Sequence, residues 1–178
     1  RAELARLGIE VVSGAEGFEM ADVPTISPAI YGAIEDGSAQ VFIDVAGDER
    51  GARVLGRFSA VIAARGFSML YVINANRPFC DSAQSLARSM KAIEGASRLA
   101  VTGVVANTNT GAESTSDDVV AGLKVAEEAA QAHGVRVEFA SVSYDLMKEE
   151  GAGILAAVSS HGVEIRPISR YMLPPWED

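Results

Sequence analysis

Several features that would define a function class are scarce in this sequence. The single cysteine, Cys80, excludes a disulfide within the chain and suits a reducing compartment, so we expect a cytoplasmic protein. The two histidines, His133 and His161, lie far from Cys80 in the sequence and give no support for a catalytic Cys/His pair or a zinc site. No apolar run approaches the roughly 20 residues of a membrane span, so we expect no integral membrane association.

Basic residues are also few. The chain has 15 Lys and Arg against 24 Asp and Glu, a formal net charge of −9, which argues against a nucleic-acid binder. Hydrophobic residues make up 48% of the 178 positions, which is enough for a globular fold with a sizeable core. No internal repeat or linker divides the sequence. We therefore predict one domain over residues 1–178, truncated at its N-terminal edge because Arg1 opens what resembles the body of a helix.

Nearly all-apolar segments alternate with amphipathic ones along the chain. This alternation predicts an α/β fold with three layers, in which helices cover both faces of a doubly wound, mainly parallel sheet. We predict strands at 9–12, 41–43, 69–73, 99–106, 135–142 and 163–165, and helices at 1–7, 28–35, 49–65, 82–97, 114–133, 144–148 and 154–159.

The stretch from Gln40 to Arg53 organises the functional hypothesis. Its apolar run at 41–43 ends at Asp44, and Gly47 follows three positions later. A carboxylate at the carboxyl end of a buried strand lies where open α/β sheets bind ligands, and it could hold Mg²⁺. Asp44 could instead cap the following helix, and Gly47 could be an ordinary turn glycine or one that senses a γ-phosphate.

Two further predicted strands end in asparagines, at Asn74 and Asn76 and at Asn107 and Asn109. Because the carboxyl ends of parallel strands meet at one edge of the sheet, these side chains and Asp44 should lie near one another. Asn107 could recognise an adenine, since its amide both donates and accepts. It could equally close its strand with an Asx-turn, and polar loops at a sheet edge are common without any function.

Arginines recur at helical spacing after Asp44. Arg50, Arg53 and Arg57 should share one helix face, which could contact phosphates or a second subunit. A solvated charged stripe beside Glu49 is the simpler interpretation.

Three motifs resemble the MinD/ParA/CobQ-type (SIMIBI) deviant P-loop ATPases, in particular a poorly characterised branch of ATP-binding or cobyrinic acid diamide synthase-like proteins. They are Val-Phe-Ile-Asp-Val-Ala-Gly-Asp (41–48), Val-Ile-Asn-Ala-Asn-Arg-Pro-Phe (72–79) and Thr-Gly-Val-Val-Ala-Asn-Thr-Asn (102–109). The ending Arg-Tyr-Met-Leu-Pro-Pro-Trp (170–176) is also similar to that branch, so the likeness covers nearly the whole chain. The chain departs from the family in having no Gly-Lys-Ser/Thr anywhere.

The resemblance implies a role for each candidate residue. Asp44 matches the Walker B aspartate, a catalytic and metal-holding residue, and Gly47 matches the switch II glycine, also assigned as catalytic. Asn107 matches the adenine-contacting asparagine, with Asn109 and Asn74 as further cofactor-binding candidates. The phosphate-binding P-loop would precede Arg1. ATP and Mg²⁺ are therefore expected to bind the full-length protein and to bind this segment only weakly.

Three functions follow as hypotheses. The first is a Mg²⁺-dependent ATP hydrolase of the MinD/CobQ type, whose ATP-bound form is a homodimer, with a possible protein client. The second is an ATP-dependent amide or carboxylate ligase of the cobyrinic acid diamide synthase kind. The third is a non-enzymatic interaction module, which applies if the chain is complete as printed.

Overall fold

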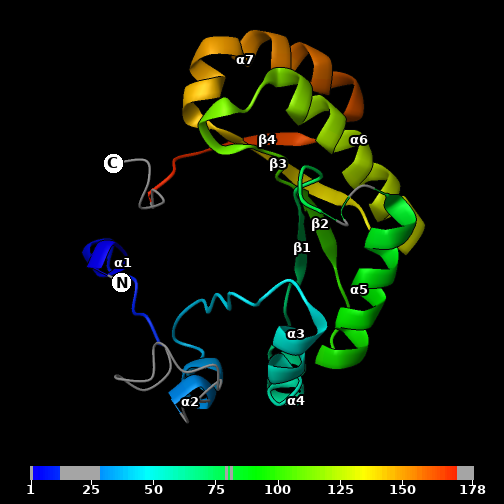
Figure 1. Cartoon of the computed structure of the whole chain (residues 1–178). Coiled ribbons are helices and arrows are strands. Elements are labelled where there is room, and N and C mark those ends of the chain that lie inside the picture. The colour runs from blue at the N-terminus through cyan, green and yellow to red at the C-terminus, as the bar shows by residue number, and fades with distance from the viewer. Residues whose placement is uncertain (1, 13–28, 79, 81, 172–178) are drawn as a thin grey trace. The chain divides into compact units, whose positions relative to one another are not determined.

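The structure is a computed structural model that describes residues 2–12, 29–78, 80 and 82–171. The predicted connection at 13–27 and most of the C-terminal motif lie outside the described residues. The chain divides into two compact units (Figure 1). Unit 1 holds Arg1–Phe67 and Ala96–Arg98, and unit 2 holds Ser68–Gly95 and Leu99–Asp178. The expectation of a single domain stays a prediction.

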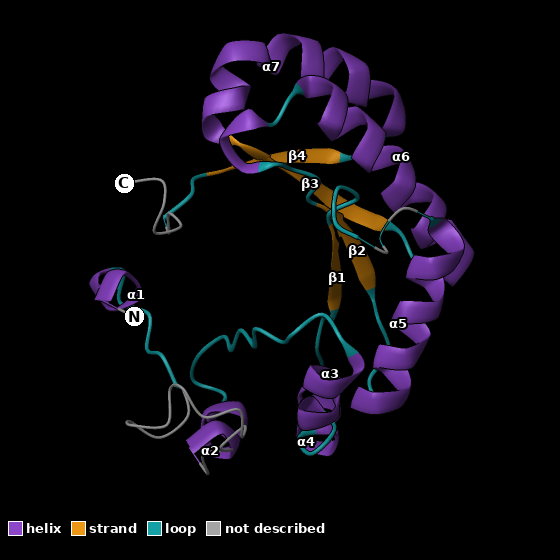
Figure 2. Cartoon of the chain, viewed as in Figure 1, coloured by secondary structure: helices purple, strands orange, loops and turns teal. Residues whose placement is uncertain are grey.

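Unit 2 is built on a parallel sheet whose four strands follow one another in sequence order (Figure 2). The sequence-based strands at 69–73, 99–106, 135–142 and 163–165 are confirmed, with shifted bounds. Their residues are β-branched or apolar at most positions, which favours extended backbone. The strands are β1 (Leu70–Ile73), β2 (Gly103–Ala106), β3 (Val137–Ser143) and β4 (Glu164–Ile168).

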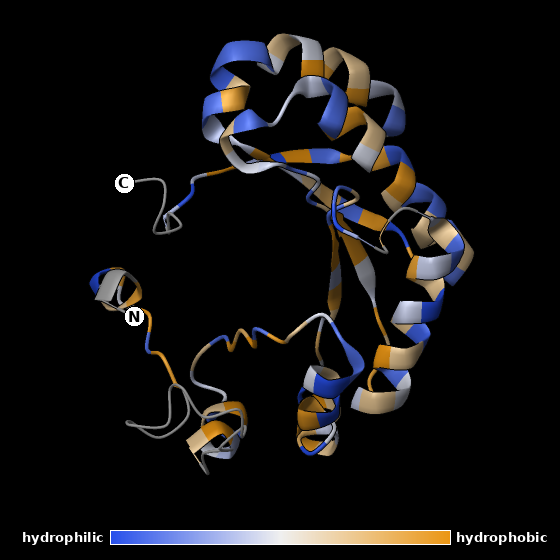
Figure 3. Ribbon diagram, viewed as in Figure 1, coloured by the Kyte–Doolittle hydropathy of each residue, from blue (hydrophilic) through white to orange (hydrophobic). Residues whose placement is uncertain are grey.

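Three long helices lie along the same face of this sheet (Figures 1 and 2). Leu86, Met90, Leu123 and Ile154 pack from these helices against the strands as one core and are no more than 1% exposed. In Figure 3, β1 is drawn mostly in the hydrophobic colour, whereas hydrophobic and hydrophilic segments alternate along β4. The helices are α5 (Ala83–Ser97), α6 (Ser116–His133) and α7 (Tyr144–Val158), with the short 3₁₀ turns η1 (Gly111–Glu113) and η2 (Ser159–His161).

The structure confirms a parallel α/β sheet flanked by helices. The finer expectation of a three-layer, doubly wound sheet stays a prediction. All residues of β2, which lies between β1 and β3, are buried. In β1, however, Leu70 and Val72 are 41% and 57% exposed. These two side chains alternate with Tyr71 and Ile73, which pack in the core, so they lie on the face of the sheet opposite α5, α6 and α7.

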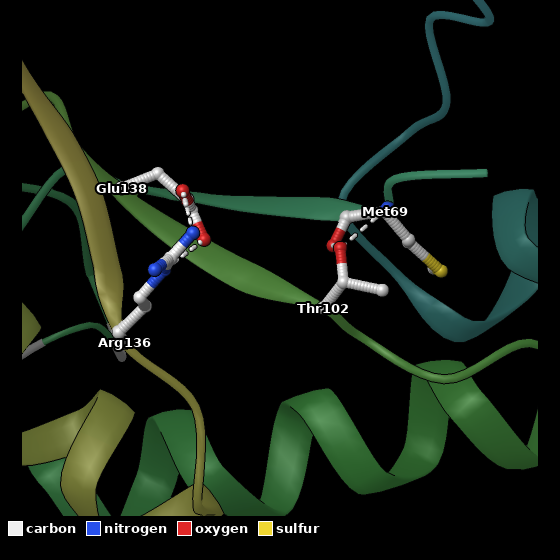
Figure 4. A network of polar contacts seen from close by, with 4 residues as sticks. All are labelled: Met69, Thr102, Arg136 and Glu138. Atoms are coloured by element: carbon white, nitrogen blue, oxygen red, sulfur yellow. Dashed lines mark hydrogen bonds and ion pairs between the residues drawn. The ribbon is translucent and has the colours of Figure 1, made fainter.

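Polar contacts lie at the amino ends of the strands, one between β1 and β2 and one within the start of β3 (Figure 4). The backbone N–H of Met69 donates to the Thr102 hydroxyl at 2.9 Å, and that hydroxyl donates to the Met69 carbonyl at 3.2 Å. The Arg136 guanidinium donates hydrogen bonds to both carboxylate oxygens of Glu138, at 2.8 and 3.2 Å. This forked pair holds the pKa of the Glu138 carboxyl below its usual value.

Unit 1 is helical in its described part. Leu55, Phe58 and Ile62 are buried as predicted, and the ring of Phe58 packs 4.7 Å from that of Tyr31. The predicted helix at 49–65 is wrong as one element, because the chain breaks into two helices around Gly56. The helices are α1 (Ala2–Arg6), α2 (Ala29–Asp36), α3 (Glu49–Leu55) and α4 (Ser59–Arg65).

The strands predicted at 9–12 and 41–43 are wrong. Both segments lack strand structure and are exposed, with Phe42 84% exposed. A strand exists only through hydrogen bonds to a neighbouring strand, and none of the described strands pairs with either segment.

The helices predicted at 144–148 and 154–159 are one continuous helix, α7. Gly151 and Gly153 lower helix propensity by about 1 kcal/mol each, which made a break plausible from sequence. Leu146, Ile154 and Val158 are buried along the helix, and this packing outweighs the propensity cost. Across the described ranges, no helix has the length and apolar character needed to cross a membrane.

Candidate functional site

The loops that follow β1 and β2 meet at the carboxyl edge of the sheet. Ile73 and Ala106 are register partners, and the backbone N–H of Asn107 donates to the Ile73 carbonyl at 2.8 Å. Just beyond, the N–H of Ala75 donates to the Thr108 hydroxyl at 3.0 Å. The expectation that the polar strand ends lie side by side is therefore confirmed for the loops at 74–76 and 107–109.

The side chains of Asn74 and Asn109 are used within these loops. The Asn74 oxygen accepts from the backbone N–H of Asn76 at 3.0 Å and of Asn109 at 3.3 Å, while its nitrogen donates to the Asn109 carbonyl at 2.9 Å. The Asn109 oxygen accepts from the N–H of Gly111 at 3.3 Å, and its nitrogen donates to the Asn107 carbonyl at 2.9 Å. Bonds to the residue two positions on are Asx-turns, so both asparagines shape the backbone.

Asn107 differs from its two neighbours. Its side-chain oxygen accepts a 2.7 Å hydrogen bond from the Ser141 hydroxyl, and no Asx-turn forms there. Its side-chain nitrogen has no partner among the described residues, although the residue is half-buried. Asn107 therefore offers an uncommitted hydrogen-bond donor at the sheet edge. Asn74 and Asn109 are less available to a ligand, because the side-chain oxygen and nitrogen of each already form hydrogen bonds.

Ser141 is a site residue that the sequence reasoning missed. It lies on β3, is 8% exposed, and its neighbours Ala140 and Val142 point into the core. A buried hydroxyl needs a hydrogen-bond partner, so a serine within an apolar strand close to its carboxyl end is the signal that could have identified it.

Helix α6 packs closely against the loop at 107–109 and fixes its position. Thr108 is 5% exposed, and a Cβ at Gly122 of α6 would overlap its side chain. Only glycine at position 122 therefore allows this approach of helix to loop. The buried threonine hydroxyl is satisfied by the Ala75 N–H.

A charged group borders the site at the start of α6. Thr115 and Asp118 form a capping box, and Asn76 donates its side-chain N–H to Asp118 at 3.1 Å. The pKa of the Asp118 carboxyl is lowered, chiefly by the hydrogen bond from the Thr115 backbone and next by that from Asn76. The carboxylate therefore stays ionised through the physiological pH range.

Asp44 and Gly47 lie in unit 1, in the exposed segment before α3. Asp44 does not cap that helix, because Asp48 is the N-cap and accepts from the Gly51 N–H at 2.8 Å. No described residue bonds to the Asp44 carboxylate. Gly47 does not adopt positive φ, and a Cβ there would meet nothing within 4 Å, so the conformation of the turn does not demand glycine.

The arginines of the same region do not share a single helix face. Arg57 falls in the break between α3 and α4, so only Arg50 and Arg53 lie on α3. All three are exposed, and Arg53 pairs with Glu49 at 3.0 Å. Such a pair contributes little in water, which agrees with a solvated charged stripe.

In the part of the chain that the structure describes, no group of three or more His, Cys, Asp or Glu could hold a metal ion. Comparison of the chain with family models, curated proteins and solved structures gave no match.

Proposed function

We propose that this chain carries the base-binding side of an ATP site and that the full-length protein is a Mg²⁺-dependent ATPase of the MinD/ParA/CobQ type. One observation carries the proposal: Asn107 presents a free amide donor at the carboxyl edge of a parallel sheet, between loops that are fixed by their own hydrogen bonds. Ligands of parallel α/β sheets bind at that edge.

The chemistry of the edge suits a purine. An adenine presents an acceptor, N7, beside a donor, its exocyclic amine. An asparagine amide can bond to both at once, with its nitrogen donating and its oxygen accepting. Among the described residues, the Asn107 oxygen accepts one hydrogen bond, from Ser141. A carbonyl oxygen has two lone pairs, so the second is available for the amine. Preformed loops also reduce the entropic cost of binding.

Asp44 is proposed as the Mg²⁺ ligand from the family resemblance and from its own availability. It is exposed, carries no structural hydrogen bond to a described residue, and is not needed as a helix cap. Bound Mg²⁺ would neutralise charge on the phosphates, and Gly47 would contact the γ-phosphate through its backbone N–H. The Gly-Lys-Ser/Thr loop that this family uses for the remaining phosphate contacts is absent from the printed sequence.

The proposal is tested by ATP binding to the full-length protein with Asn107→Asp. This change keeps the shape and the Ser141 bond, because a carboxylate also accepts, but it removes the N–H donor. Loss of one hydrogen bond, worth about 1 kcal/mol, together with repulsion of the base acceptor, should weaken ATP binding by about tenfold or more. Calorimetry or a fluorescent ATP analogue gives the dissociation constant.

Thr110→Asp is the matched control. It adds the same charge to the same loop at an exposed position whose side chain bonds to no described residue. We expect its ATP affinity to stay within about twofold of that of the unaltered protein. Equal affinities of the Asn107→Asp and Thr110→Asp variants, or no ATP binding by the unaltered protein, would refute the proposal.

A further inference from the structure

The Ser141 hydroxyl bonds to the oxygen end of the Asn107 amide. The parallel register of β2 and β3 pairs Ala106 with Ala140, so the next residues, Asn107 and Ser141, follow side by side at the strand ends. The Ser141 hydroxyl lies 2.7 Å from the Asn107 oxygen and 3.4 Å from the Ala106 carbonyl. Both of these oxygens can only accept, so the hydroxyl is the donor, and the shorter distance to Asn107 is that of a strong O–H···O bond.

The direction of this bond has a chemical consequence. The two ends of an asparagine side chain have nearly the same shape, but one donates and the other accepts. When the hydroxyl donates to the Asn107 oxygen, the Asn107 side-chain nitrogen faces away from β3. In that position the nitrogen bonds to no described residue. Without the hydroxyl, the two orientations of the amide would differ less in energy, and the side chain would present donor and acceptor to a ligand in turn.

We propose that Ser141 is a positioning residue that holds Asn107 as a donor toward an acceptor atom of the bound base, N7 of a purine, with adenine preferred over guanine. The preference arises because the remaining lone pair of the Asn107 oxygen faces the group at the purine 6-position. In adenine that group is a donating amine, and in guanine it is a carbonyl, which repels the oxygen. This inference rests on the proposed function, since it assumes that a nucleotide binds at this edge.

The test compares ATP, GTP and 7-deaza-ATP, which carries C–H in place of N7, on the full-length protein and two variants. The unaltered protein should bind ATP about tenfold more tightly than 7-deaza-ATP, the value of one hydrogen bond. In Ser141→Ala we expect this ratio to fall to about twofold, and the ATP/GTP ratio to fall with it. Ser141→Thr keeps the hydroxyl and should retain both ratios.

A second measurement needs no ligand. The ¹⁵N–¹H signals of the Asn107 side-chain amide should shift in Ser141→Ala and change little in Ser141→Thr, because the hydroxyl bond fixes the amide. A merely structural role for Ser141 would lower stability without changing the ATP/7-deaza-ATP ratio.

The outcomes separate the two ideas. If the unaltered protein binds ATP and Ser141→Ala keeps the full ratio, the inference is wrong and the proposed function stands. A threonine variant that behaves like the alanine variant also overturns the inference, because the hydroxyl would then not be the cause. If the unaltered protein binds no nucleotide, the inference and the proposed function both fall.

Discussion

Three asparagines at the carboxyl edge of β1 and β2 serve different purposes, because their neighbours differ. Asn74 and Asn109 close Asx-turns and tie the two loops to each other. Asn107 instead accepts from the Ser141 hydroxyl, and its side-chain N–H groups donate to none of the described residues. The candidate site is thus one donor held in place by a network of loop hydrogen bonds.

The proposed roles of Asp44 and Gly47 give a prediction at single residues. Asp44→Ala should lower ATP turnover by the full-length protein at least about tenfold. Mutation even of residues that only support a metal ligand typically lowers metal affinity or activity about 10–100-fold. Gly47→Ala should also lower turnover, because a Cβ would crowd the close approach of the γ-phosphate that is proposed for the Gly47 N–H. Neither change should alter the free energy of unfolding by more than about 0.5 kcal/mol, because both residues are exposed and Gly47 has an ordinary φ.

The control for this experiment is Asp145→Ala, which removes an exposed carboxylate at the first turn of α7. Phosphate release at saturating ATP and Mg²⁺ gives turnover, and urea unfolding gives stability. Turnover that is the same in Asp44→Ala and Asp145→Ala would remove the assigned role of Asp44.

At the scale of elements, the N-terminus of α6 borders the site. Its N-terminal Thr115 and Asp118 satisfy each other's backbone N–H groups, and Asn76 links this capping box to the loop after β1. Its C-terminus ends at Gly134, which has φ 84°. Both ends of the helix are therefore fixed by local sequence, as a capping box and a C-terminal glycine predict.

The capping box gives a pH prediction. Because the folded pKa of Asp118 lies below its unfolded value, its contribution to stability is fully present above the unfolded pKa, about 3.9. The contribution is lost as the pH falls through the folded pKa. The difference in unfolding free energy between the unaltered protein and Asp118→Asn should thus be constant from about pH 5 to 7 and shrink toward pH 2.

Thr115→Ala is the companion variant. It removes the non-titrating half of the capping box and should lower the free energy of unfolding by about 1 kcal/mol at neutral pH. Urea unfolding followed by circular dichroism, repeated at several pH values, measures both variants. An Asp118→Asn difference that does not change with pH would contradict the assigned cause of the lowered pKa.

At the scale of the whole molecule, the core of unit 2 depends on burial under α5, α6 and α7. Leu123 of α6 is 0% exposed within that core, while Leu155 of α7 is 53% exposed. Leu123→Ala should lower the free energy of unfolding by about 2–5 kcal/mol, because it removes buried apolar surface and leaves a cavity.

Leu155→Ala is the matched control, since it makes the same chemical change on the water-facing side of a helix. We expect it to change the free energy of unfolding by no more than about 0.5 kcal/mol. Similar losses for both variants in urea unfolding would mean that the described packing of unit 2 is wrong.

The sequence alone determined the strands of unit 2 and the helices α5 and α6, because the spacing of apolar residues, the helix caps and the glycines act within a few residues. It also indicated that the loops after β1 and β2 would meet, which parallel pairing requires. The P-loop NTPase likeness and the roles of Asp44 and Gly47 stay predictions.

Only the tertiary structure decided the remaining features. Residues 41–43 look like a buried strand from their composition, but a strand needs a paired neighbour, and no described strand provides one. The sequence predicts two short helices at 144–148 and 154–159, whereas packing makes them one continuous helix, α7. Asn107 could not be told from Asn74 or Asn109, because the partner that distinguishes it, Ser141, is 34 residues away in the sequence and reaches it only when β3 pairs with β2.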